Sequence, residues 1–241
     1  MDEAFSCPFM YWVGMDTPTG ADPGSLTKFN EFYSKVHLPE VMGANPGFVR
    51  ASRYELLTPD PRGDFGPRWL AIYEMADEAA AQAYVERNDG PPEGRPTYTQ
   101  GPSVWQAAQS RWRMIWRYLS SSGTTGQAPF SIFLVGMNVP PDTNEAGLAE
   151  FNDFYTQIHV PEVIAARGYA RGTRFELHRE FKHPEPGCPR FCAVYEDTKD
   201  GGRPAQAAGS DPVPSPFSSG PPTWEKHDTL WRLVYRRIDL T

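Results

Sequence analysis

The chain repeats a long segment of its own sequence, and this repeat limits its fold more than any other feature. Residues 29–33, Phe-Asn-Glu-Phe-Tyr, return 122 positions later as residues 151–155, Phe-Asn-Asp-Phe-Tyr. Similar matches continue along both halves, and the last, Gly-Pro-x-x-Trp at 101–105 and 220–224, has an offset of 119. Insertions and deletions therefore nearly cancel, and the sequence predicts two copies of one structural unit.

We place the two copies at residues 1–122 and 123–241. Pro39 is expected to end the first helix, because a proline disfavours the helical conformation in the residue before it. It can then open a further short turn, with the Glu40 carboxylate near the positive end. The Ser- and Gly-rich segment 120–126 is expected to link the copies. In the first copy, apolar periodicity and turn residues predict strands at 9–15, 47–57, 69–75 and 111–119 and helices at 25–37 and 78–87.

The second copy repeats this order with one exception. Where the first copy has its second helix, residues 201–219 are rich in Gly and Pro, and we expect them to be irregular. The remaining pattern predicts strands at 131–139, 169–180, 191–197 and 231–240 and a helix at 145–159.

The order strand–helix–strand–strand–helix–strand is typical of the ferredoxin-like arrangement. In it, a four-stranded antiparallel sheet has its helices on one face. Trp112, Ile115 and Trp116 alternate along the last strand of the first copy, so the other face must be buried too. We therefore predict an α+β chain in which two ferredoxin-like repeats pack sheet to sheet as an intramolecular barrel.

Composition narrows the classes of function. A net charge of −7 argues against nucleic acid as the main partner. No apolar run is long enough to span a membrane, and the acidic N-terminus is not that of a secretory leader. The three cysteines form no disulfide framework, so we expect a cytoplasmic protein in which Cys192 is a small buried thiol. His178, Glu180, His183 and Glu185 have no counterpart in the first copy, and we predict a solvated loop there and no metal site.

A set of polar residues occurs in both copies at helical spacing. Asn30, Tyr33 and His37 lie near one face of the predicted helix, and Asn152, Tyr155 and His159 repeat them. Histidine is suited to proton transfer near neutral pH. The alternative is that each imidazole caps the end of its helix.

Other shared residues extend this set. Glu40 and Glu162 could orient the imidazoles, or could only interact with the helix dipole. Arg53 and Arg174 could bind an anionic group, although ion pairs with Glu55 and Glu176 on the same strand face are the simpler interpretation. Tyr73, Tyr195, Trp105 and Trp224 could line a cavity or fill the core. We predict catalytic roles for His37, His159, Tyr33, Tyr155, Glu40 and Glu162, and substrate contacts for Asn30, Asn152, Arg53, Arg174, Tyr73, Tyr195, Trp105 and Trp224.

The aromatic-rich helix followed by His-x-Pro, at 37–39 and 159–161, resembles the dimeric α+β barrel superfamily, and most closely its EthD-type and muconolactone-isomerase-like branches. The resemblance implies a cavity between sheet and helices into which the histidine points. It also implies activities that include lactone isomerisation, polyketide cyclisation, cofactor-free oxygenation and haem-dependent reactions. The family usually builds its barrel from two chains, whereas here the second copy could supply the partner, as a monomer or a homodimer.

These observations together predict an enzyme that acts on a small, apolar, ring-containing metabolite by histidine acid–base chemistry without a cofactor. The reaction would be an isomerisation, cyclisation, elimination or oxygenation. A haem-dependent enzyme and a non-catalytic carrier of a hydrophobic ligand are the alternatives. The first copy is favoured as the active one because both its helices are intact, while the irregular segment 201–219 favours the second.

Overall fold

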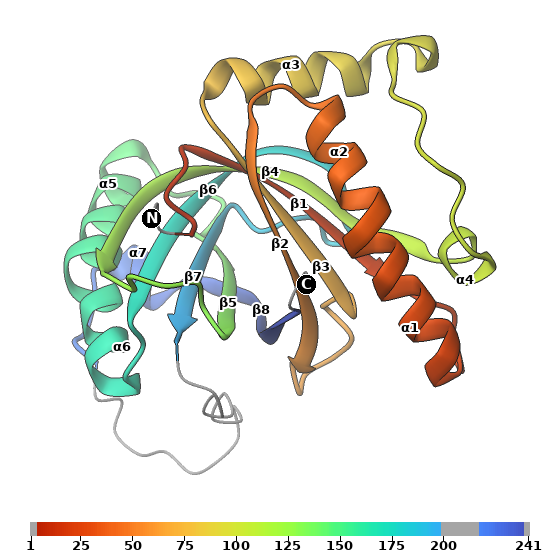
Figure 1. Cartoon of the computed structure of the whole chain (residues 1–241). Coiled ribbons are helices and arrows are strands. Elements are labelled where there is room, and N and C mark those ends of the chain that lie inside the picture. The colour runs from red at the N-terminus through yellow and green to blue at the C-terminus, as the bar shows by residue number, and fades with distance from the viewer. Residues whose placement is uncertain (1–3, 199–216, 239–241) are drawn as a thin grey trace.

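Figure 1 shows a computed structural model of the chain, which describes residues 4–198 and 217–238. Eight antiparallel strands form a closed barrel in the order β1-β3-β2-β8-β5-β7-β6-β4. The predicted α+β class and intramolecular barrel are confirmed. The strands are β1 Phe9–Asp16, β2 Phe48–Thr58, β3 Trp69–Met75, β4 Gln109–Gly123, β5 Ser131–Asn138, β6 Arg171–Lys182, β7 Phe191–Asp197 and β8 Asp228–Ile238.

Two seams join the copies, one between β2 and β8 and one between β4 and β6. The second seam corrects the predicted linker. Residues 120–123 belong to β4, where Ser120 lies opposite Arg174 and Gly123 lies opposite Arg171. The barrel closes only if β4 is long enough to pair with β6. The hydrogen bonds of this pairing hold residues 120–123 in a strand, although their Ser- and Gly-rich composition favours a flexible linker.

The helices lie outside the barrel, with those of the first copy along one side and those of the second along the other (Figure 1). Each copy has one long helical segment with a five-residue π-helical turn in its middle. The helical elements are α1 Pro23–Phe32, η1 Tyr33–His37, α2 Leu38–Ala44, α3 Glu78–Asp89, η2 Pro92–Gly94, α4 Ser103–Gln106, α5 Glu145–Phe154, η3 Tyr155–His159, α6 Val160–Arg167 and α7 Pro222–Glu225. None of the described helices is long and apolar enough to cross a bilayer.

The prediction that the first helix breaks at Pro39 is wrong, whereas the prediction that Pro39 opens a further helical turn is confirmed by α2. The backbone of Leu38 remains helical, with φ −63° and ψ −45°, and its N–H donates to the carbonyl of Tyr33 in a π-turn. The hydrogen-bond register changes at this turn, so Pro39 falls in the first turn of α2, where a missing N–H is tolerated. The helix also begins earlier than the predicted start at residue 25, because Asp22 is the N-cap and accepts from the backbone N–H of Ser25.

The strand pattern divides the core into an interior and two helix-covered layers. Trp12, Trp112, Trp116 and Trp231 fill the barrel interior, whereas Ile115 faces the helices. This confirms the alternation predicted for the last strand of the first copy. The segment 201–219, expected to be irregular, lies mostly outside the described residues.

Candidate functional site

Each copy places its histidine at the end of a π-helical turn, in η1 for His37 and in η3 for His159. In both turns a backbone N–H donates to the carbonyl five residues back instead of four. Leu38 donates to Tyr33, and Val160 donates to Tyr155. Single π-turns of this kind are rare in proteins as a whole, and those that occur are often found at functional sites. Both copies keep the turn, so it belongs to the repeated unit.

The His37 ring is enclosed by aromatic side chains. Its centroid lies 4.5 Å from Trp105, 5.1 Å from Tyr98, 5.4 Å from Tyr33 and 6.4 Å from Phe32. The sequence predicted that Tyr33 lies near this histidine on one helical face, and it left open whether Trp105 lines a cavity or fills the core. Tyr98 and Phe32 were not predicted.

The second copy reproduces this enclosure almost to a tenth of an ångström. The His159 centroid lies 4.4 Å from Trp224, 5.2 Å from Phe217, 5.5 Å from Tyr155 and 6.4 Å from Phe154. Tyr98 and Phe217 are equivalent under the offset of 119 that relates Trp105 to Trp224. Extending the repeat register through the Pro- and Gly-rich loops would therefore have found them.

The surroundings keep both imidazoles neutral. Nδ1 of His37 and Nδ1 of His159 are buried without a hydrogen-bond partner. Burial lowers the pKa of each ring from 6.5 to about 4, although Glu40 and Glu162 partly oppose this effect. The helix-capping alternative is wrong, because the helix continues into α2 or α6 and neither Nδ1 accepts or donates a hydrogen bond.

A pair of buried tyrosines lies beside each imidazole. Tyr33 interacts electrostatically with Tyr73 of β3, and Tyr155 interacts in the same way with Tyr195 of β7. Burial raises the pKa of all four phenols, so they remain protonated at neutral pH and can donate hydrogen bonds.

The arginines do not form the ion pairs expected along their strands. Arg53 reaches under α1 to Asn30, and Arg174 reaches in the same way to Asn152. Glu55 instead pairs with Arg68 and Arg236, its neighbours across the sheet. Glu176 likewise pairs with Arg117 and Arg190. The expectation failed because Glu55 and Glu176 lie further along their strands, beside arginines of adjacent strands.

Glu40 and Glu162 each form hydrogen bonds with a segment of chain that covers the histidine of the same copy. The carboxylate of Glu40 accepts from the backbone N–H and the hydroxyl of Thr99, next to Tyr98. Glu162 accepts from the same two groups of Ser218, next to Phe217. We call residues 98–105 and 217–224 the covering segments. The hydroxyl of Thr99 is the largest cause that lowers the pKa of Glu40.

Replacing Glu40 by Ala is expected to loosen the first covering segment and leave the second unchanged. Amide hydrogen exchange at Thr99 should accelerate, while that of Ser218 should not; Glu162→Ala should give the opposite pattern. The wild-type tether requires the carboxylate, so it should persist at neutral pH and weaken only as the pH falls through the lowered pKa of Glu40. Unchanged protection of Thr99 in Glu40→Ala would contradict this role.

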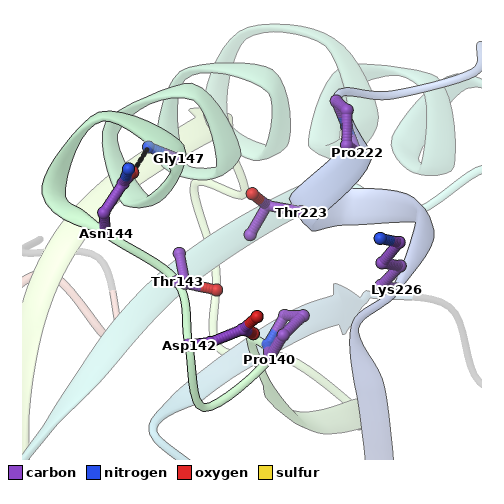
Figure 2. Close-up of a pocket in the computed structure, with 8 residues that line it drawn as sticks. All are labelled: Pro140, Asp142, Thr143, Asn144, Gly147, Pro222, Thr223 and Lys226. Atoms are coloured by element: carbon purple, nitrogen blue, oxygen red, sulfur yellow. Dashed lines mark hydrogen bonds between the residues drawn. The ribbon is translucent and has the colours of Figure 1, made fainter.

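Two adjoining hollows, of about 200 and 550 Å³, lie where the β5–α5 connection meets α7. Figure 2 shows the smaller one, between Asp142 and Thr143 on one side and Thr223 and Lys226 on the other. Neither hollow is lined by a histidine. The residue after Thr223, however, is Trp224, whose ring packs on His159, so α7 separates the hollow from that imidazole.

With the covering segments in place, four aromatic rings stand within 6.4 Å of each imidazole centroid, so a haem could reach His37 or His159 only if the covering segment moved. Within residues 4–198 and 217–238, no group of three or more His, Cys, Asp or Glu side chains could hold a metal ion.

Known structures share the fold of this chain, but the structures compared below have a low sequence identity to it. No family model and no curated protein sequence matches the chain. A solved structure described provisionally as a chlorite dismutase aligns over 96% of this chain and 95% of its own, with 14% identity and a TM-score of 0.53. An anthrone oxidase-like protein aligns over 97% of this chain and 93% of its own, with 11% identity and a TM-score of 0.51. At these identities the likeness establishes the fold alone.

Proposed function

We propose that this chain, which has the fold of the dimeric α+β barrel superfamily, is an enzyme that removes a proton from a small, apolar, ring-containing metabolite, with His37 or His159 as the base. The observation on which this rests is the buried Nδ1 that lacks a hydrogen-bond partner in both copies. An unsatisfied buried acceptor or donor costs about 1–3 kcal/mol. Two copies that both keep it favour a site in which a ligand supplies the missing partner.

The chemistry follows from the neutral state of the ring. With a pKa of about 4, the imidazole is unprotonated at neutral pH and can accept a proton from a C–H beside a carbonyl or from a phenol. The substrate becomes an enolate or phenolate and the ring becomes imidazolium. The new anion raises the imidazole pKa, which helps the ring to hold the proton. Tyr33 or Tyr155, still protonated, can donate to the developing oxyanion.

Returning the proton to a different atom gives an isomerisation, and loss of a leaving group from the anion gives an elimination. Attack by the carbanion within the substrate gives a cyclisation, and reaction of the anion with dioxygen gives an oxygenation. The proposed reaction is one of these four, since all begin with the same proton transfer.

The substrate ring would take the place of a ring on the covering segment. Tyr98 and Phe217 are only partly buried, and each meets its histidine edge to face. Lifting the segment would remove this ring and leave an aromatic-walled space suited to a flat apolar guest. An anthrone, named in one of the structural matches, is such a molecule: a tricyclic ketone with an acidic methylene group.

Deuterium exchange of anthrone tests the proposal without any oxidation step. Under anaerobic conditions in D₂O, the protein should accelerate exchange of the methylene protons. The double variant His37→Ala/His159→Ala should lose the acceleration by about 10²–10⁴-fold, whereas His178→Ala, outside both sites, should keep it. The single variants report whether one copy or both are active.

If the double variant exchanges the probe as fast as the wild type, the histidines are not the base. If the protein binds anthrone without accelerating exchange, it is a carrier of such ligands and not an enzyme acting on them.

A further inference from the structure

A buried arginine lies beneath each π-turn and donates to the same three acceptors in both copies. Nη1 of Arg53 lies 3.1 Å from the Asn30 carbonyl and 2.7 Å from Ser34 Oγ, and Nη2 lies 2.8 Å from Asn30 Oδ1. The corresponding distances from Arg174 are 3.0 Å to the Asn152 carbonyl, 2.7 Å to Thr156 Oγ1 and 2.7 Å to Asn152 Oδ1.

These arginines have no carboxylate partner within salt-bridge distance among the described residues, although Arg53 is 0% exposed and Arg174 is 1% exposed. Each charge is held by the three neutral acceptors and by an aromatic face: Cζ lies 4.1 Å from the Tyr33 centroid in one copy and 4.2 Å from the Tyr155 centroid in the other. A cation buried without an anion is costly. Two equivalent cases therefore indicate a specific use.

That use is visible at the junction between helix types. Where each α-helix widens into a π-turn, the backbone hydrogen bonds change register, and the carbonyls of Asn30 and Asn152 accept from the N–H three residues on, that of Tyr33 or Tyr155. Asn30 and Asn152 lie at this junction, two residues before the last residue of α1 or α5 and three before the first residue of η1 or η3. The guanidinium donates to the carbonyl and to the side chain of the same asparagine, and its third bond reaches the hydroxyl of the second residue of the π-turn.

We propose that Arg53 and Arg174 are positioning residues that hold the π-turns and thereby fix the location of His37 and His159. One residue corresponds to about 100° around a helix. Without this one-residue change of register, each imidazole would turn by that angle away from its aromatic enclosure. The guanidinium must supply two donors in a fixed fork, which an ammonium cannot do. This proposal concerns the position of each imidazole. Only the role of that imidazole as a base rests on the proposed function.

Histidine NMR of the ligand-free protein tests this, and each copy serves as the control for the other. In Arg53→Gln, the His37 signals should move and its pKa should rise from about 4 toward 6.5, while His159 is unchanged; Arg174→Gln should do the reverse. Part of this rise is electrostatic, because the charge of Arg53 lowers the pKa of His37 while Glu40 raises it. In the second copy, Arg174 and His227 lower the pKa of His159 while Glu162 raises it.

Arg53→Lys separates charge from geometry. If the fork holds the turn, the lysine variant should show displaced His37 signals although its charge is kept. If its His37 spectrum matches the wild type, charge alone suffices and the proposal is overturned. Asn30→Ala, which keeps the arginine and removes one acceptor, should displace the same signals more mildly and serves where Arg53→Gln fails to fold.

Unchanged spectra in all three variants would show that Arg53 only fills space. Because no substrate is involved, this result is independent of turnover. Displaced signals combined with a failed anthrone experiment would leave the positioning role standing and refute only the proposed function.

Discussion

Acidification from about pH 7 to about pH 4.5 is expected to lower the free energy of unfolding by about 2–3 kcal/mol through each of His37 and His159. Each ring has a pKa lowered by burial from 6.5 to about 4 in the folded chain. The unfolded chain therefore binds more protons in this pH range. The contribution is fully present above the unfolded value and is lost as the pH falls toward the folded value.

Urea unfolding of four proteins isolates this effect from that of the carboxylates. The wild type, His37→Gln, His159→Gln and the double variant should be compared at both pH values. Each single substitution should reduce the stability difference between the two pH values by about 2–3 kcal/mol, and the double by about twice that. Equal pH dependence in all four would show that the aromatic enclosure does not desolvate the rings.

The same enclosure shows how far the sequence could define the site. The repeat register brought His37, Tyr33, Tyr73 and Trp105 into one proposed cluster, and the structure places them together. This worked because helix and strand periodicities fix which side chains share a face. The barrel followed from the same pattern, since both faces of each sheet had to be buried.

The π-turn could not be predicted in this way. A shift of one residue in the hydrogen-bond register leaves no trace in apolar periodicity, and Pro39 argued for a break instead. The groups at the junction, Asn30 and Ser34, meet Arg53 only once β2 has packed beneath α1. Ser34 and Thr156 share a repeat position and a hydroxyl group, which was the one signal available in the sequence.

Glu196→Gln is expected to lower the free energy of unfolding by about 3–5 kcal/mol, because it removes one partner of a fully buried ion pair. Arg171 Nε lies 2.6 Å from Glu196 Oε1, and the side chains are 2% and 0% exposed. The pair joins β6 to β7, and Arg171 also donates to the carbonyl of Ala4. Without the carboxylate, the guanidinium would stay buried after losing its ion pair with Glu196.

The repeat provides a matched comparison in Glu74→Gln. Glu74 pairs with Arg50 at 3.0 Å, but the Arg50 side chain is 29% exposed and can turn toward water. Loss of the Glu74 carboxylate should therefore lower the free energy of unfolding much less than loss of the Glu196 carboxylate.

The double variant Arg171→Met/Glu196→Leu should recover most of the stability, since two apolar side chains of similar volume leave no buried charge. Chemical unfolding of the variants measures all of these effects. Equal losses for Glu74→Gln and Glu196→Gln, or a double variant no more stable than Glu196→Gln, would show that the buried charge is not what destabilises the barrel.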